Sequence, residues 1–383
     1  MAHKAALNGI TWNHSRGYLP LVATAQRFMD RNPDVTIEWQ KRSLQAFADE
    51  PVERLAERFD LIVIDHPFAG YAAAHPTLIS LDEHLPADFL SDQAANSVGG
   101  SHDSYNFGGH QWALAIDAAT PVSSWRPDLL ARYEVEVPGT WEDLLALARR
   151  GLVAMPAIPI DSLMSFYMLC LALGEQPFVC TEEVVSQDTG VAALETVREL
   201  VTLCAPACLE RNPIRTYEAM VGGDDIIYCP FAYGYVNYAR PEYAEKPLAF
   251  GGLVTLAGRR LRSTLGGTGL AISVHCRDLD LALDYAQFVA SPECQCGLFA
   301  IAGGQPGHRR AWLEPEVNRI CQGYFRDTLP ALDEAWLRPR YDGYIPFQDR
   351  AGPVVHAYLR EGGDPSAVLD QLNHLCRESR TDG

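Results

Sequence analysis

The stretch FDLIVID, from Phe59 to Asp65, decides the fold. Within it, Leu61 to Ile64 form the strongest apolar run of the chain, and this run is far too short to cross a membrane. A continuous apolar run of this length predicts a strand covered on both faces, as in a parallel sheet with helices on either side. The flanking sequence is therefore expected to supply helices and further strands.

The residues before this stretch alternate between strand and helix patterns. A strand is predicted over 7–12, a polar loop over 13–17, a helix after it and a second strand over 35–39. Another helix is predicted around 47–58. Because strands that alternate with helices form βαβ units, these residues predict a mostly parallel sheet.

A second region begins near Asp117. There the stretch from Thr140 to Asp143 predicts a helix that begins with a capping box, and a further helix is predicted over 191–204. A strand over 226–228 is expected to lead into an aromatic loop. A strand over 269–274 is then expected to return the chain to the first region.

The C-terminal part is predicted to be mainly helical. Apolar residues at helical spacing predict a helix over 281–289, and Ser291 followed by proline is typical of the start of the next one. From about residue 329 the pattern stays helical, with breaks expected at Pro339, Pro346 and Pro353.

Length and charge narrow the possible classes of protein. The chain has 383 residues, which favours two domains over one. Its formal net charge is −18, and an acidic surface repels phosphate backbones and anionic lipids. We therefore expect no nucleic-acid partner, no membrane-surface role and no membrane span.

The N-terminus and the cysteines both bear on the compartment. The short stretch from Met1 to Leu7 is followed at once by polar residues, so it lacks the apolar core of a secretory signal. The ten cysteines favour reduced, mostly buried thiols, because a chain of this size needs no disulfide framework. The sequence thus predicts a cytoplasmic protein, or a periplasmic one if a leader has been removed.

Six segments, in order along the chain, resemble one protein family. They are QRFMDRNPDVTIEW (Gln26 to Trp39), FDLIVIDHPFAGYAAAHPTLISLDEHL (Phe59 to Leu85), PGTWEDLLALA (Pro138 to Ala148), LGGTGLAIS (Leu265 to Ser273), GGQPGHRRAW (Gly303 to Trp312) and LRPRYDGY (Leu337 to Tyr344). Together they resemble the family 1 extracellular solute-binding proteins, the carbohydrate-type components of ABC importers.

This resemblance implies an α/β fold of the two-lobed, type II periplasmic-binding-protein kind, with discontinuous domains and a ligand cleft between the lobes. One lobe would comprise residues 1–117 and about 266–325, and the other about 118–265 and about 326–383. Family members close like a flytrap around a solute. The resemblance therefore implies a monomer that binds a sugar, polyol or small acid without a cofactor, and that serves an ABC permease if it is exported.

Candidate site residues are expected in loops at strand ends, because such loops line the clefts of these folds. Asp65 and His66 end the buried strand, and Asp117 lies where the chain enters the second region. Sugars present hydroxyls and C–H faces, which polar and aromatic side chains bind. The alternative for each residue is a structural role, such as a helix cap. The loop after the first predicted strand adds five more candidates: Trp12, Asn13, His14, Ser15 and Arg16.

The second region and the returning strand supply the remaining candidates. Asp161 precedes a predicted helix, where it is either a ligand contact or only a cap. Gly267 and Thr268 lie in a glycine-rich stretch whose backbone N–H groups could approach a ligand. That stretch lacks the third glycine of a dinucleotide fingerprint, since Ile272 stands there. Three aromatic residues are expected in a loop wall, with core packing as the alternative: Phe231, Tyr233 and Tyr235.

Motifs for catalysis and for metal binding are missing from the sequence. There is no nucleophile elbow, no P-loop, no His-Glu-x-x-His motif and no cysteine pairing with zinc-finger spacing. We therefore expect no catalytic residues, metal or cofactor. His14, His66, Asp65 and Asp117 could still converge as histidine–carboxylate pairs. The alternative function is thus a cytoplasmic metabolite sensor or an acid–base enzyme on the same scaffold.

Overall fold

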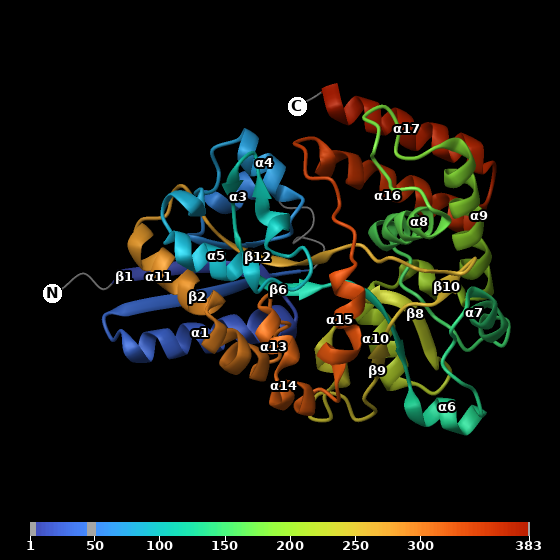
Figure 1. Cartoon of the computed structure of the whole chain (residues 1–383), viewed down its shortest axis with the longest axis horizontal. Helices are drawn as coiled ribbons and strands as arrows, with labels where there is room; N and C mark the ends of the chain where they lie inside the picture. Colours follow the sequence, from blue (N-terminus) through green and yellow to red (C-terminus); the bar gives the residue numbers. More distant parts are fainter. Residues whose placement is uncertain (1–4, 44–50, 382–383) are drawn as a thin grey trace. The chain divides into compact units, whose positions relative to one another are not determined.

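The computed structural model describes residues 5–43 and 51–381 of the chain. The chain divides into two compact units, and each is discontinuous in sequence. Unit 1 consists of Met1–Ala119, Leu265–Leu329 and Arg340–Asp342, and unit 2 of Thr120–Thr264, Pro330–Pro339 and Gly343–Gly383. Each unit has its own central sheet, with helices packed around it (Figure 1).

Unit 1 is built on a five-stranded sheet with the order β2-β1-β3-β12-β6. β1 is parallel to both β2 and β3, whereas β12 is antiparallel to its neighbours β3 and β6. β12 runs against the others because the chain leaves unit 1 at the end of β6 and re-enters at the same edge. The mostly parallel sheet that the sequence predicts is thus interrupted by one strand. The strand bounds are β1 Ala5–Trp12, β2 Val35–Arg42, β3 Leu61–Ile64, β6 Leu114–Ala119 and β12 Gly266–Ile272.

Helices cover both faces of this sheet (Figure 1). α1 (Ser15–Arg31) and α11 (Leu279–Ala290) pack on one face, and α3 (Val52–Ala56) and α4 (Phe68–Ala74) on the other. Every residue of β3 is buried, and its side chains alternate between the two cores, as the apolar run predicts. α3 is shorter than the helix predicted around 47–58, of which residues 47–50 lie outside the described residues.

Shorter elements complete unit 1. Ser291 caps α12 as predicted, since its Oγ accepts the Cys294 N–H at 3.3 Å, and a π-helical turn follows directly. The bounds of these elements are η1 Leu81–Glu83, α5 Ala87–Ala95, η2 Asp103–Tyr105, β4 Asn106–Phe107, β5 His110–Gln111, α12 Pro292–Cys294, η5 Gln295–Phe299, α13 Arg309–Leu313 and α14 Pro315–Ile320. α15 (Tyr324–Asp333) begins in unit 1, and its residues from Pro330 onward belong to unit 2.

Unit 2 contains a three-stranded antiparallel sheet with the order β8-β7-β9. Its strands are β7 Pro121–Trp125, β8 Tyr228–Tyr233 and β9 Ala249–Gly251. The strand predicted over 226–228 therefore begins and ends later. Phe231 and Tyr233 lie within it instead of in an aromatic loop, because β8 stays paired with β7 as far as the Pro121–Tyr233 pair.

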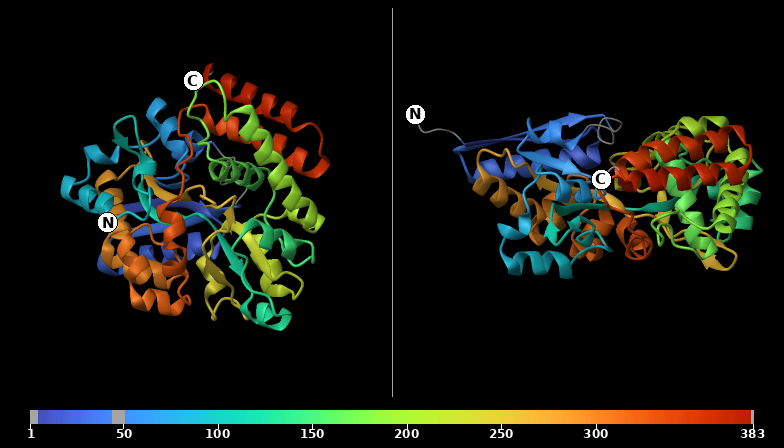
Figure 2. Two further views of the ribbon diagram at one scale, coloured as in Figure 1. Left: turned by 45° about the vertical axis from the view of Figure 1, so that its right-hand side comes forward. Right: turned by 90° about the horizontal axis from the view of Figure 1, so that it is seen from above.

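Long helices make up much of unit 2. α8 (Pro159–Leu173), α9 (Gln187–Leu203), α16 (Tyr344–Glu361) and α17 (Pro365–Thr381) pack together, and both views of Figure 2 show α16 and α17 beside α9. The remaining elements are α6 Pro127–Tyr133, α7 Trp141–Ala148, η3 Pro206–Glu210, α10 Pro213–Gly222, η4 Val236–Ala239, β10 Thr255–Leu256 and β11 Arg259–Arg260.

The predicted capping box begins a helix as expected, whereas the predicted proline breaks do not occur in the C-terminal helix. α7 begins with the predicted capping box, in which Thr140 and Asp143 exchange side-chain and backbone hydrogen bonds of 3.0 and 3.1 Å. By contrast, Pro346 and Pro353 do not break the C-terminal helix, and both lie inside α16. Pro346 is in the first turn, where no helical N–H bond is lost, and packing against α8 and α17 holds the helix through Pro353.

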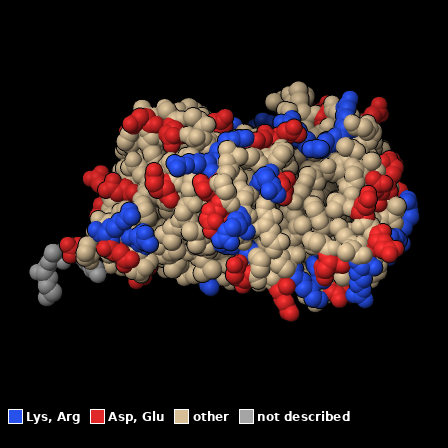
Figure 3. Space-filling view, turned by 60° about the horizontal axis from the view of Figure 1, so that its bottom comes forward, with Lys and Arg blue, Asp and Glu red and all other residues tan. Residues whose placement is uncertain are grey.

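On the face drawn in Figure 3, acidic and basic side chains are interspersed over the surface. Over residues 5–43 and 51–381, no helix combines the length and apolar character that crossing a bilayer requires. The ten cysteines carry free thiols, and most of them are buried.

A buried arginine anchors α6 to the rest of unit 2. The Arg126 side chain is fully buried, and its Nη1 donates to the Met220 and Gly223 carbonyls at 2.7 Å each. Its Nε and Nη2 donate to the two Asp128 oxygens at 2.7 Å, and Nη2 also donates to Asp224 at 3.1 Å. All of its donors are thus used, and hydrogen bonding to Asp128 raises the pKa of Arg126.

We predict that Arg126→Met lowers the free energy of unfolding by about 3 kcal/mol, because it leaves one buried carbonyl, one half-buried carbonyl and two carboxylates without their donor. Arg132→Met is the matched control, since Arg132 is 65% exposed and its nitrogen lies 3.6 Å from Asp224. The control should cost less than about 1 kcal/mol. Urea unfolding at pH 7 measures both values, and equal losses would contradict the anchoring role.

Candidate functional site

The predicted site residues of unit 1 gather along one edge of its sheet. The loop after β1 and the residues after β3 lie at this edge because the two strands are parallel neighbours. Asp117 lies in β6, and Thr268 of β12 pairs directly with it. Since the start of β12 pairs with the ends of β3 and β6, both residues belong to the same edge. The topology therefore brings together residues that are far apart in sequence.

A buried ion pair links Arg16 to Asp117 at this edge. Arg16 Nε donates to Asp117 Oδ2 at 2.9 Å, and Nη2 donates to Oδ1. Arg16 is 4% exposed and Asp117 2% exposed, so the pair is removed from solvent. Burial raises the pKa of Asp117, while the Arg16 charge and a backbone N–H of Gln305 oppose that rise. The pair ties the start of α1 to β6 across 101 residues of sequence.

Trp12 belongs to the core instead of presenting its ring to solvent. It is 3% exposed and packs in the core on the α1 side of the sheet. The Arg16 guanidinium carbon lies 5.9 Å from the centre of its ring. A Cβ atom at Gly17 would lie 2.4 Å from the ring, so only glycine lets α1 approach this closely. Trp12 thus positions the start of α1.

His14 is the N-cap of α1. Its Nδ1 accepts the Arg16 N–H at 3.0 Å, and the residue is buried. Burial, and secondarily the Arg16 charge, lower the pKa of His14 to about 3. The imidazole is therefore neutral at physiological pH, and because Nδ1 is an acceptor its proton is assigned to Nε2.

The other polar residues at this edge differ in exposure. His66 is buried, and Asp65 Oδ1 accepts its N–H at 2.8 Å. Asn13 is exposed, and its backbone N–H donates to the Arg42 carbonyl at 2.7 Å. The Ser15 hydroxyl oxygen is buried and has no hydrogen-bond partner among the described residues.

The glycine-rich stretch, whose backbone N–H groups were expected to approach a ligand, is a strand. Gly267 and Thr268 lie in β12 and pair with Ala118 and Asp117 of β6, so their backbone belongs to the sheet. Gly267 has φ +101°, and a Cβ there would lie 2.3 Å from the Asp117 carbonyl oxygen, which explains the glycine. Thr268 is 6% exposed, and its Oγ1 has no hydrogen-bond partner among the described residues.

In unit 2, Asp161 is the third residue of α8. It is 6% exposed, and its Oδ2 has no hydrogen-bond partner in the described part of the chain. Burial raises the pKa of Asp161 to about 8. Burial is the main cause that raises the pKa of the Cys229 thiol in β8, and the Asp161 charge adds a smaller contribution. Asp161 is not the cap of α8, because the N-cap residue is Ile158 and no side chain caps this helix.

The three aromatic candidates have different surroundings. Phe231 is buried and stacks on Trp141, with ring centres 6.5 Å apart and planes within 11°. The Tyr233 hydroxyl lies 2.9 Å from Thr264 Oγ1. Tyr235 is 6% exposed and packs edge-on against Tyr217 of α10 at 6.3 Å, which is the arrangement of a core residue.

The sequence does not predict a role for some buried polar atoms that belong to neighbouring segments of the chain. The Trp141 Nε1 is buried, and no hydrogen bond to another described residue satisfies it. From the sequence, Trp141 is predicted only to lie within the capping box that begins a helix. In unit 1 the Gln305 N–H supports Asp117, although its segment is recognised only as a family signature. No local pattern distinguishes these residues from structural ones.

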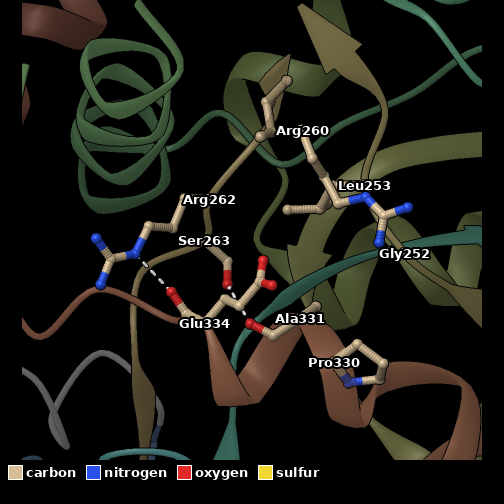
Figure 4. Close-up of a pocket in the computed structure, with 9 residues that line it drawn as sticks. Gly252, Leu253, Arg260, Arg262, Ser263, Pro330, Ala331 and Glu334 are labelled. Atoms are coloured by element: carbon tan, nitrogen blue, oxygen red, sulfur yellow. Dashed lines mark hydrogen bonds between the residues drawn. The ribbon is translucent and has the colours of Figure 1, made fainter. Parts of the chain in front are cut away.

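Two hollows occur within single units, away from the predicted residues. One of about 10 Å³, large enough for about one water molecule, lies in unit 2 (Figure 4). Its wall is held by Arg262 Nε, which donates to the Glu334 carbonyl at 2.6 Å, and by Ser263 Oγ, which donates to the Ala331 carbonyl at 3.1 Å. The other, of about 590 Å³, lies over α13 to α15 in unit 1 and is lined by Trp312, Leu313 and Arg319 among others.

Metal binding finds no support within residues 5–43 and 51–381. No group of three or more His, Cys, Asp or Glu side chains there is arranged to hold an ion. The candidate site therefore offers hydrogen bonds, charge and aromatic surface.

Comparison with known proteins identifies the fold. No protein-family model matches the chain, and no curated protein matches its sequence. The maltose-bound MalE3 of T. maritima matches with a TM-score of 0.81 and 18% identity, over 99% of this chain and 100% of that one. An ABC transporter solute-binding protein of Agrobacterium radiobacter K84, in complex with ribitol, gives a TM-score of 0.83 and 17% identity, over 98% of both chains.

The GacH receptor of Streptomyces glaucescens, solved unliganded and with acarbose, gives a TM-score of 0.81 and 16% identity over 99% of both chains. The chain thus has the two-lobed α/β fold of sugar and polyol solute-binding proteins along its whole length. The resemblance stated from the sequence is confirmed for the fold.

We predict that Arg16→Met lowers the free energy of unfolding by about 3–5 kcal/mol, because it leaves the buried Asp117 carboxylate without its cation. Asp117→Leu should cost a similar amount by stranding Arg16. The double variant should be more stable than the sum of the two losses allows, since neither charge remains. Urea unfolding of all four proteins gives the coupling energy, and additive losses would show that the pair is unimportant.

We also predict that His14 makes the protein less stable in acid. The folded state holds this pKa near 3 whereas the unfolded value is 6.5, so the unfolded state binds the extra proton between these values. The free energy of unfolding should therefore fall by about 1.4 kcal/mol per pH unit below about pH 6 from this group alone. His14→Asn, which keeps a good N-cap, should flatten this dependence.

Denaturant unfolding at pH 7 and pH 5 measures the effect. His84→Asn is the control, because His84 is exposed. The prediction fails if wild type and His14→Asn lose the same stability between the two pH values.

Proposed function

We propose that this chain binds a small polar solute, a sugar, polyol or small acid, and that the polar edge of the unit 1 sheet contributes to the binding site. The observation that carries the proposal is the Thr268 hydroxyl, which is buried beside the Asp117 backbone without a hydrogen-bond partner. Buried polar groups are nearly always satisfied, so an unsatisfied one at a strand end points to a missing ligand.

The fold supports this proposal. The solved structures that it matches include proteins bound to maltose, ribitol and alpha-D-tagatose. Neutral polyhydroxy compounds require several hydrogen-bonding groups held in fixed positions. The Arg16–Asp117 pair and the His14 cap would keep this edge rigid in the absence of solute.

A transport role would require export and an ABC permease as partner. Closure of the two lobes around the solute is part of that role. These remain proposals, and we expect the protein to act as a monomer in either compartment. The free thiols favour a reducing compartment, where a metabolite sensor on the same fold is the competing function.

An acid–base enzyme has less support from the site chemistry. His14, with a pKa of about 3, is a weak base, and Asp117 is engaged by Arg16. His66 is buried with its backbone and ring held by Asp65. The groups that the sequence places as possible proton carriers are therefore committed to structure, which favours binding over turnover.

The test is capture of a solute from a bacterial metabolite extract, followed by desalting, unfolding of the protein and mass spectrometry. Binding predicts one compound released intact in proportion to the protein. Loss of a compound far beyond the amount of protein, together with a new mass, would instead identify an enzyme.

Two threonine variants connect this assay to the site. Thr268→Val should reduce capture at least tenfold without loss of stability, because it removes only a hydroxyl that has no partner in the protein. Thr24→Val is the matched control: the Thr24 hydroxyl is buried, donates to the Leu21 carbonyl at 3.0 Å and lies 3.0 Å from the Tyr285 hydroxyl. The control should lose stability and keep capture. The reverse pattern would overturn the site assignment.

A further inference from the structure

Asp161 differs from the other buried charged side chains in lacking a partner. Arg16 and Asp117 satisfy each other, and Arg126 is engaged by two carboxylates and two carbonyls. Asp161 Oδ2 has no hydrogen-bond partner among the described residues, and burial is the cause that raises its pKa. A carboxyl group kept in this state costs stability, so a compensating role is expected.

Asp161 lies at the start of a long helix. It is in the first turn of a 15-residue helix, whose N-terminal backbone favours a negative charge. Asp161 is 6% exposed, and its Oδ2 has no partner among the described residues. A cation is therefore what this carboxylate lacks in the described part of the chain.

We propose that the solute carries a protonated amine and that Asp161 binds it. This inference rests on the proposed function and narrows the class of solute. A buried carboxylate is stabilised strongly only by a paired cation. A formal net charge of −18 attracts cationic solutes and repels anionic ones.

Other classes of solute suit Asp161 less well. An anionic solute would be repelled as soon as Asp161 ionises. A neutral hydroxyl would leave the carboxyl protonated and would use neither the helix start nor the overall negative charge. An aminated sugar or polyol uses both.

The affinities for a cationic solute and for a neutral solute should change in opposite directions with pH. A cationic solute must displace the proton that Asp161 holds up to about pH 8, so its affinity should rise from pH 6 to pH 8. A neutral solute held by the protonated carboxyl would lose affinity over the same range. Two thiols of unit 2 also have shifted pKa values: burial raises the pKa of Cys229, to which the Asp161 charge contributes, and a hydrogen bond from Cys204 lowers the pKa of Cys208.

The test uses the metabolite extract separated by cation exchange at pH 7 into a cationic pool and a flow-through pool. The proposal expects stoichiometric capture from the cationic pool alone. Capture from the flow-through pool would overturn the amine inference and leave the proposed binding function intact. Capture from neither pool would overturn both, so the two failures are distinguishable.

Variants of Asp161 and of other unit 2 residues test whether its carboxyl group is responsible for the capture of cationic compounds and for the pH dependence of this capture. Asp161→Asn should reduce capture of the cationic compound more than tenfold and should abolish its rise between pH 6 and pH 8. Asp188→Asn is the matched control, because Asp188 is an exposed aspartate in the first turn of another unit 2 helix, α9. Cys208→Ser should keep the rise with pH, which separates the carboxyl from the thiols. Unchanged capture by Asp161→Asn would overturn the proposal.

The melting temperature of Asp161→Asn shows whether a loss of binding is caused by unfolding. Because the unpartnered Asp161 holds its proton more tightly in the folded state, it lowers stability as pH rises from about 4 to about 8. Asp161→Asn should therefore melt no earlier than wild type at pH 8. A variant that melts earlier and also fails to capture would show that Asp161 stabilises the fold, which contradicts the proposal.

Discussion

The buried pair of Arg16 and Asp117 is the interaction on which the polar edge of unit 1 depends. It joins the first turn of α1 to β6, and Trp12 and the His14 cap hold the arginine from the other side. An ion pair removed from water stabilises only when both partners are present and well oriented. The geometry of this edge is therefore fixed by charge, while the sheet beneath it is held by apolar packing on both faces.

The two units differ in whether their buried charged side chains have partners within the protein. In unit 1 the charges at the polar edge are matched within the protein, and what remains unmatched is a neutral hydroxyl, that of Thr268. In unit 2 the unmatched group is a carboxyl, that of Asp161. A hydroxyl group of a solute suits the first of these groups, and a cationic group suits the second.

Much of the fold follows from local sequence patterns, and most of the site does not. The apolar run of β3 and the capping box of α7 are set by neighbouring residues, so they are predictable. The Arg16–Asp117 pair spans 101 residues, and no local signal specifies it. β8 continues through Phe231 because it pairs with β7, a partner more than a hundred residues earlier in sequence. The isolation of Asp161 depends on which side chains stay away from it, and a sequence pattern cannot express that.

The position of β12 has a consequence for synthesis of the chain on the ribosome. β12 lies between β3 and β6, yet it is made only after the unit 2 residues Thr120–Thr264. At typical translation rates the nascent chain therefore spends on the order of ten seconds with β3 and β6 unable to join. During that time the facing edges of two apolar strands have open hydrogen-bonding groups, which can pair with other chains. Productive folding of this protein thus requires that these edges be shielded, by transient local structure or by a chaperone, until the late strand arrives.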